Sequence, residues 1–294
     1  MNKQKETMDS RELGLVLGQQ LLNVDDMHYG MWDNNLELKL SNIAAAQQRY
    51  TDALFADIDS LGLEAPKVLD IGCGTGHILG QMVDKGYQAD GLVPAPGFAK
   101  LVNQRLAERP QSTAKLFQIP FQDFPVAEYK DHYDVALFSE SFQYIPMDKS
   151  FDILQKIVRP GGRIIICDFF KTANDGDGGK GDGTFGGGHR WSHYQEVISK
   201  LPFSVVKDED ITSLMSPNLV LVNDLLMNTL APAGQTVGRY MRVNYPKTSK
   251  LVAFLLRKKF KKLKDKYFTG LRSQETFERY KTYHHIVLDV PEKK

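Results

Sequence analysis

The chain has 294 residues, of which 42% are apolar and 25% charged, an ordinary composition for a globular protein with a core. Its formal net charge of +1 excludes a global positive field, so we expect no nucleic-acid partner. The first residues lack the apolar run of a signal peptide, and the apolar stretch 251–256 is far too short to span a bilayer. With only Cys73 and Cys167 as cysteines, we predict reduced thiols and a cytoplasmic location.

Short apolar runs alternate with helical stretches through the middle of the chain. Residues 10–63 are predicted to be helical because apolar residues recur there at helical intervals. The alternation from Pro66 to Phe170 predicts a parallel sheet with crossover helices, whose ligands bind beyond the carboxyl ends of the strands. We predict strands at 67–71, 88–93, 115–119, 133–138 and 163–169, and helices at 77–85 and 97–108.

A glycine-rich segment follows the fifth predicted strand, with eight glycines among residues 175–188. Residues 175–183 resemble a calcium loop only superficially, because the twelfth position counted from Asp175 is Gly186 and not glutamate. We therefore interpret the segment as a mobile lid and expect no metal site. Beyond it we predict a helix at 192–200, a strand at 203–208, helices through 215–282 and a last strand at 283–290.

The first strand ends in a turn, Asp70 to Gly76, that holds glycines at positions 72, 74 and 76. Glycines at such a turn allow a sharp bend and let a ligand approach the main chain beside a helix N-terminus. The dinucleotide-binding pattern needs a further glycine at position 77, where His77 stands. The glycines alone therefore predict a nucleotide-type turn without deciding the nucleotide.

A series of ordered segments narrows the choice. The segment 68–76 is followed by Phe124-Pro125, by 133–140 and by 159–163. This series resembles the class I methyltransferases that use S-adenosyl-L-methionine, particularly those acting on small molecules and lipids. The resemblance implies an α/β fold with a doubly wound, mostly parallel seven-stranded sheet whose last strand is antiparallel. We divide this single domain into an N-terminal helical extension (1–63), a Rossmann-like core (64–214), a helical substrate cap (215–282), and a final strand with the tail (283–294).

The resemblance also implies roles for individual residues. Asp70 would orient the amino end of the cofactor's methionine moiety, and Ser139 and Glu140 would line that end. Phe121 and Gln122 fall where the family contacts adenine. Gly72 and Gly74, with Cys73 and Gly76 of the same turn, would let the cofactor lie against the main chain. Two alternatives stay open: Phe121 is a core residue, or Glu140 is an acid that interacts with a helix start.

One position departs from the family pattern. The second strand of these proteins usually ends in an acidic residue that binds the ribose hydroxyls, and Val93 stands at that position. Asp90, three residues earlier, is expected on the opposite face of the strand. A valine accepts no hydrogen bond, so we hypothesise weakened cofactor affinity or a substitute ribose partner.

The segment His28 to Trp32 and three histidines carry the predictions for the reacting end of the site. Tyr29 and Trp32 would wall a cavity that holds a sulfonium, since aromatic faces attract cations, or they pack in the core. Tyr144 is a further candidate substrate contact. If the acceptor needs a general base, the candidates are His28, His189 and His193, although a structural or surface role is open for each.

Near the end of the chain, Leu256, Phe260, Leu263 and Tyr267 recur at helical spacing among the basic residues of 257–266. This basic amphipathic helix is a solvated face or a docking site for anionic lipid or an acidic protein. Three functions follow: a methyltransferase for a small or lipid-like molecule, a protein (lysine) methyltransferase that docks an acidic protein, or a non-catalytic cofactor-binding regulator. A closed apolar pocket favours the first, an open groove beside the basic helix favours the second, and Val93 supports the third.

Overall fold

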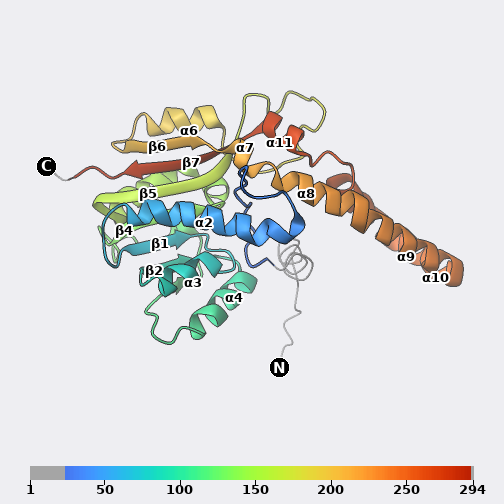
Figure 1. Cartoon of the computed structure of the whole chain (residues 1–294), viewed down its shortest axis with the longest axis horizontal. Coiled ribbons are helices and arrows are strands. Elements are labelled where there is room, and N and C mark those ends of the chain that lie inside the picture. The colour runs from blue at the N-terminus through green and yellow to red at the C-terminus, as the bar shows by residue number, and fades with distance from the viewer. Residues whose placement is uncertain (1–23, 293–294) are drawn as a thin grey trace.

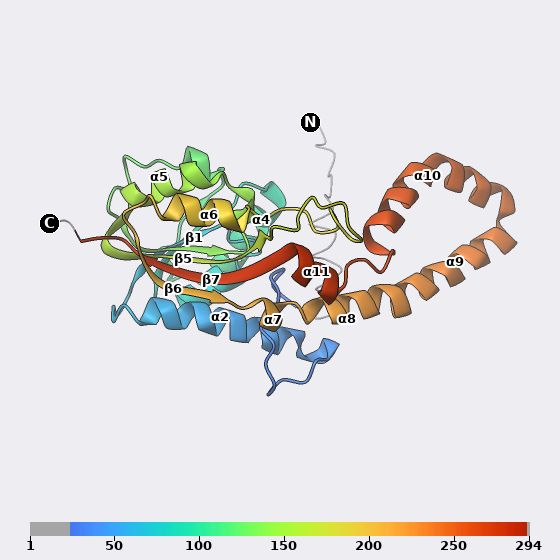
Figure 2. The same cartoon turned by 90° about the horizontal axis from the view of Figure 1, so that it is seen from above.

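A seven-stranded mixed sheet forms the centre of the protein (Figure 1; Figure 2). The computed structural model describes residues 24–292, without the side chains of 259, 260 and 262–266. The strand order is β3-β2-β1-β4-β5-β7-β6, and β7 alone runs antiparallel to its neighbours, which confirms the predicted fold class. The strands are β1 (Lys67–Ile71), β2 (Gln88–Leu92), β3 (Leu116–Phe117), β4 (Tyr133–Ser139), β5 (Val158–Lys171), β6 (Ser204–Asp210) and β7 (Lys281–Asp289).

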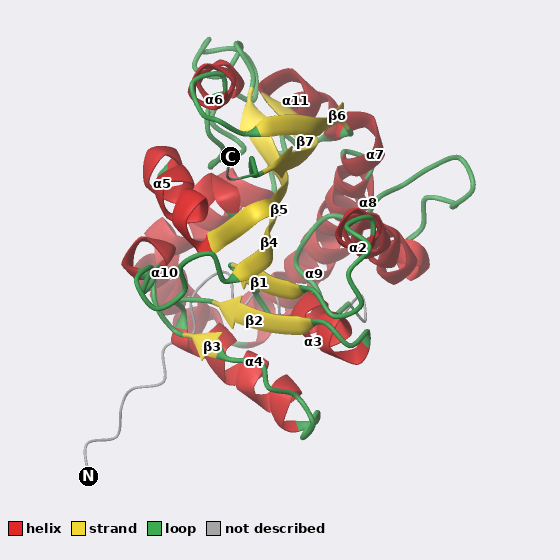
Figure 3. Ribbon diagram, turned by 90° about the vertical axis from the view of Figure 1, so that its left-hand side faces the viewer, coloured by secondary structure: helices red, strands yellow, loops and turns green. Residues whose placement is uncertain are grey.

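Helices cover both faces of the sheet (Figure 3). Because side chains alternate along a strand, Val68 and Ile165 pack into one hydrophobic cluster while their neighbours Leu69 and Ile164 pack into the other. The first cluster includes α2 (Ile43–Asp59), α3 (His77–Asp84) and α4 (Pro96–Ala107), and the second includes α5 (Met147–Ile157) and α6 (Trp191–Ile198). Burial on both faces explains why these strands are continuously apolar in sequence.

The N-terminal extension is less helical than the sequence predicts. The predicted helix over 10–63 lies partly outside the described residues, and 24–39 form no helix, so that helical structure begins with the 3-10 turn η1 (Leu40–Asn42). Hydrogen bonds to other elements hold this segment extended instead. The Met31 amide donates to the Ala46 carbonyl, the Trp32 amide to the Leu214 carbonyl, and the Gly30 amide to Asn218 Oδ1.

An ion pair and hydrogen bonds with residues 279–280, just before β7, hold the glycine-rich segment 175–188. Asp177 accepts hydrogen bonds from Arg279 and from the Tyr280 hydroxyl. Asp182 accepts from the backbone amides of Gly176 and Gly178, which closes the segment on itself. These contacts place the segment beside the start of β7; whether it moves as a lid stays a prediction.

The region between β6 and β7 is helical, as predicted. It contains α7 (Thr212–Met215), α8 (Asn218–Asp224), the π-helix η4 (Leu225–Leu230), α9 (Ala231–Asn244), α10 (Pro246–Tyr267) and α11 (Gln274–Tyr280). Whereas α7 and α11 contact β7, α9 and α10 project away from the sheet (Figure 2). Within residues 24–292, no helix is long and apolar enough to cross a membrane.

Candidate functional site

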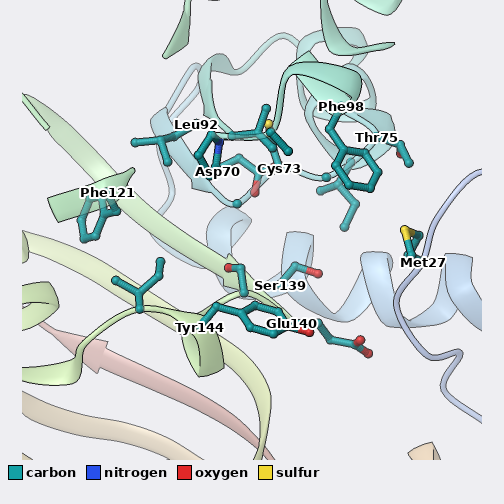
Figure 4. A pocket seen from close by; sticks show the side chains of 18 of the residues that line it. Met27, Asp70, Cys73, Thr75, Leu92, Phe98, Phe121, Ser139, Glu140 and Tyr144 are labelled. Carbon is teal, nitrogen blue, oxygen red and sulfur yellow. The ribbon is translucent and has the colours of Figure 1, made fainter. Parts of the chain in front are cut away.

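A cavity of about 580 Å³ lies where the carboxyl ends of β1, β2 and β4 meet (Figure 4). The strand order reverses between β1 and β4, which is where ligands bind in open α/β sheets. This volume is within the range of about 300–1,000 Å³ typical of small-molecule sites. The cavity is lined by residues of the glycine turn, the end of β2, the 3-10 turn η2 (Phe121–Asp123), the end of β4 and the segment 26–28.

The glycine turn brings main chain to the cavity wall. Gly72 and Gly74 have φ angles of +82° and +52°, the left-handed region that side chains disfavour. A Cβ at Gly72 would collide with Ser141, whose hydroxyl donates to the Ile71 carbonyl and ties the turn to β4. A Cβ at Gly74 would meet only the Gly72 carbonyl, at 4.0 Å. The open side of Gly74 therefore leaves room for a ligand to lie against the backbone.

Asp70 presents a buried carboxyl group to this cavity. Its Oδ2 atom has no hydrogen-bond partner among the described residues, which is unusual for a buried polar atom. Burial, together with the nearby Asp26 carboxylate and against a smaller opposing effect of His28, raises the pKa of Asp70 to about 7. The site therefore has an acceptor that a cationic ligand group would both pair with and hold ionised.

Asp26 lies between two histidines at the cavity edge. It is 2.5 Å from His77 Nδ1 and 3.4 Å from His28 Nε2. Burial raises the pKa of Asp26, but the two histidines outweigh this effect and hold it below the ordinary range. Burial lowers the pKa of His28, but Asp26 and Glu140 outweigh it, so the His28 pKa is raised. The cluster favours an ionised carboxylate beside an imidazolium.

Glu140 joins three parts of the chain at the end of β4. Its φ of +50° is rare for a residue with a side chain, and such strain is found at functional sites. Glu140 Oε1 accepts hydrogen bonds from the Tyr29 amide at 2.7 Å and from the Tyr283 hydroxyl at 2.9 Å. Burial raises the pKa of Glu140, against the opposing effect of His28. Glu140 thus fixes the N-terminal segment and β7 at the cavity.

The end of β2 supplies an apolar wall. Val93 is buried and lines the cavity beside Leu92 and Phe98. Asp90 points away, as predicted, and accepts hydrogen bonds from the Lys115 amide and the Tyr133 hydroxyl. The strand therefore offers no carboxylate at the cavity.

Most residues predicted for a cofactor site lie together. The cavity lining includes Asp70, Gly72, Cys73, Gly74, Val93, Phe121, Gln122, Ser139 and Glu140, and also the predicted substrate contact Tyr144. Phe121 is at the same time part of the hydrophobic core, and its contact with adenine stays a prediction. Tyr144 is largely exposed, as expected for a residue at a cavity mouth.

Three of the residues predicted as contacts do not line the cavity. Gly76 does not line the cavity: a Cβ there would approach Val102 to 3.0 Å, so this glycine permits close packing of α3 on α4. The Tyr29 ring packs against Phe277 and Tyr283. Trp32 is buried in a small separate cluster with Val24 and Ile43. Both aromatic rings thus pack among other apolar side chains, which agrees with the core-packing alternative.

The candidate bases are separated by the structure. His28 lines the cavity, but His189 and His193 do not. His189 Nε2 lies 3.1 Å and 3.0 Å from the carbonyls of Phe142 and Ile145, which occupies it in a turn, and His193 is exposed on α6. The glycine-rich segment returns beside the end of β5, where the Lys171 amide donates to the His189 carbonyl, and not at the cavity.

The sequence analysis missed Asp26, Met27, Thr75 and Phe98, all of which line the cavity. An acidic residue two positions before His28 was the available signal for Asp26. The helical cap was predicted to build the substrate pocket, but no described residue of α9 or α10 lines this cavity. Those helices project outward instead.

Comparisons with known proteins agree with this geometry. Residues 69–166 match the family model described as methyltransferase domain. The sterol 4-C-methyltransferase strm-1 of Caenorhabditis elegans is 34% identical over 116 residues, which covers 37% of this chain and 32% of that protein. The chain thus spans about a third of the length of this curated relative.

Two solved structures are similar over nearly the whole chain. Geranyl diphosphate C-methyltransferase from Streptomyces coelicolor A3(2) has a TM-score of 0.65 at 18% identity, covering 94% of this chain and 91% of that chain. The 4+2 cyclase SpnF has a TM-score of 0.64 at 16% identity, covering 96% of each chain. At such identities the likeness shows the fold alone, and one fold serves both reactions. The domain match, the strand order and the glycine turn therefore identify residues 69–166 as a methyltransferase domain within a Rossmann-like fold.

Proposed function

We propose that the protein binds S-adenosylmethionine in the cavity and transfers its methyl group to a small, lipid-like acceptor. The observation that carries this proposal is the buried Asp70 carboxyl, whose Oδ2 has no partner among the described residues and faces the cavity beside the open side of Gly74. A carboxyl group in this state fits the ammonium of an amino acid moiety.

Different lining residues contact different parts of the cofactor in the proposed complex. Asp70 pairs with the ammonium, and the main chain at Gly72 and Gly74 contacts the body of the cofactor. Phe121 and Gln122 hold the adenine, with the Phe121 ring as an apolar wall. S-adenosylmethionine supplies an electrophilic methyl group on a sulfonium, so the protein's main task is to align the acceptor and exclude water.

His28 is a poor general base in this scheme. Its Nδ1 donates to the Tyr29 carbonyl at 2.8 Å, and its Nε2 faces the Asp26 carboxylate. Asp26 and Glu140 outweigh burial and raise the His28 pKa, which favours the protonated ring and disfavours proton abstraction. We therefore infer that His28 positions the N-terminal segment at the cavity.

The proposed acceptor class rests on the apolar wall and on the relatives. Met27, Phe98 and Ile145 give the cavity an apolar wall, and two of the similar proteins are named for a sterol and for geranyl diphosphate. The alternative of a lysine methyltransferase finds no support in the cavity, because no described part of the basic helix borders it. The two buried free cysteines favour a reducing compartment, for which we propose the cytoplasm.

Methyl transfer is tested with methyl-labelled cofactor in a cell extract that contains the purified protein. We expect label in the organic-soluble fraction, lost with Asp70→Asn and kept with Asp152→Asn, a control on the exposed face of α5. Label in protein would overturn the small-molecule acceptor. Calorimetry tests the remaining case, in which the protein binds the cofactor tightly but transfers no methyl group. That result would favour the non-catalytic regulator, for which Val93 is the specific support.

A further inference from the structure

The segment 231–258, which we call the arm, comprises α9 and the first part of α10 and has no buried residue. Its apolar side chains are nonetheless numerous and strongly exposed, with exposed fractions of 72% for Val243, 65% for Phe254 and 66% for Leu255. The arm extends from the body of the protein into open space (Figure 1; Figure 2). Monomeric proteins rarely leave so many neighbouring apolar side chains in water, which indicates a partner.

The two helices of the arm present these side chains differently. On α9, Val237, Tyr240 and Met241 have the i, i+3, i+4 spacing of one helix face, whereas Arg239 and Arg242 fall on the opposite face. On α10, residues 251–256 are six consecutive apolar residues that surround the whole helix. An apolar stripe suits a groove, but a helix that is apolar all round suits a surrounding apolar medium.

The arm is also strongly cationic. It contains six basic and no acidic residues, and the sequence has no aspartate or glutamate from 225 to 264. The basic residues are Arg239, Arg242, Lys247, Lys250, Arg257 and Lys258. Two such arms would repel each other, which disfavours a second copy of this chain as the partner. The charge instead matches a negatively charged surface.

From these observations we infer that the arm docks on the surface of an anionic lipid bilayer. The apolar run of α10 enters the boundary between headgroups and acyl chains, and the flanking Lys250 and Arg257 contact lipid phosphates. An α-helix with its side chains is about 10–12 Å across, comparable with the depth of about 5–10 Å to which the apolar face of an interfacial helix is buried. Tyr240 and Tyr245 supply the amphipathic rings that favour this boundary.

A bilayer suits the arm better than an acidic protein for one geometric reason. Exposed apolar side chains lie on α9 and on all sides of the first part of α10, whereas a protein groove covers a single face of a helix. The inference stands independently of the proposed methyl transfer, because no described residue of the arm lines the cavity.

Vesicle flotation with the full chain tests the inference. We expect binding to vesicles of phosphatidylcholine mixed with phosphatidylserine, weak binding to phosphatidylcholine alone, and release by salt. The double substitution Phe254→Ser and Leu255→Ser should weaken binding at least about tenfold through lost apolar burial. Arg257→Gln with Lys258→Gln should weaken it by about tenfold or more.

Two matched pairs serve as controls. Val205→Ser with Val206→Ser removes exposed apolar side chains from β6, and Lys130→Gln with Lys149→Gln removes exposed charges from the body. Both pairs should bind vesicles as the unchanged protein does.

Three outcomes would overturn the inference. The first is no binding to phosphatidylserine vesicles, or binding that the arm variants leave unchanged. The second is tighter binding to polyglutamate than to these vesicles, which would assign the arm to an acidic protein. The third is a dimer that the Phe254 and Leu255 substitutions dissociate, which would make the arm an interface between copies.

Discussion

The strands of the sheet and the arm use apolar residues in opposite ways. The run Ile164 to Cys167 in β5 is almost completely buried between two layers of helices, whereas the run 251–256 in α10 has no buried member. Both are short, continuously apolar segments, and their compositions alone do not tell them apart. The difference lies in their neighbours: helices cover both faces of β5, and nothing described in this chain covers the arm.

The cavity and the arm also differ in the burial and the sign of their charged residues. At the cavity, the buried Asp26 and Asp70 and the half-buried Glu140 have shifted pKa values and stand close to His28. In the arm, charges of one sign are exposed and free of acidic neighbours in sequence. Buried, opposed charges suit the binding of a specific small ligand, while an exposed field of one sign suits attraction to a surface.

The largest expected effect tests the difference in burial directly. Leu54 on α2 is fully buried, and Leu255 on α10 is largely exposed, so truncation to alanine compares the same change in two helices. Leu54→Ala should lower the free energy of unfolding by about 2–5 kcal/mol, because it leaves a cavity in the core. Leu255→Ala should change it by less than about 0.5 kcal/mol, as expected for a surface position. Urea unfolding followed by circular dichroism measures both.

Comparable losses for the two variants would contradict the comparison. They would mean that Leu255 is buried in solution, either within the chain or between copies. Repeating the measurement at several protein concentrations distinguishes these cases, since only an interface between copies makes stability concentration-dependent.

The next effect concerns the buried charge of the cavity. Asp70 has a pKa of about 7, raised above its ordinary value, so it is protonated below that pH and ionised above it. A ligand ammonium pairs with the ionised form, and the affinity for S-adenosylmethionine should therefore rise about tenfold between pH 6 and pH 8. Asp70→Asn should weaken binding and abolish this rise in calorimetric titrations. A rise that persists in Asp70→Asn would assign the titration to another group.

The sequence predicted the sheet well because its signals are local. Continuous apolar runs mark strands buried on both faces, and the glycine turn with its following helix marks the ligand edge. The number of strands and the antiparallel last strand followed from the family resemblance. The cavity-lining residues of this turn and of β4 were predicted for the same reason, since each lies at the end of a predicted strand.

Residues whose role depends on distant contacts were not predictable in this way. Tyr29 and Trp32 looked like cavity walls, but the hydrogen bonds of their segment to α2 and α7 turn both rings into the core. Asp26 is held at the cavity because its carboxylate accepts a hydrogen bond from Nδ1 of His77, 51 residues away. The arm was predicted as part of a substrate cap because sequence shows that a segment is helical and does not show where the helix points.

The smallest expected effect concerns Val93, where the family resemblance implies an acidic residue. Val93→Asp restores two oxygen acceptors at the end of β2, and a hydrogen bond to a charged acceptor contributes about 1.5–3 kcal/mol. Burial of the new carboxylate opposes this gain, so we expect cofactor affinity to rise by only about three- to tenfold. Val93→Asn, which has a similar shape without the charge, should give a smaller gain in the same titration. If the unchanged protein binds with sub-micromolar affinity and Val93→Asp adds nothing, another group already holds the ribose. In that case the apolar wall at β2 is a functional part of the site. The protein would then have two apolar surfaces that face a ligand, this wall and the arm.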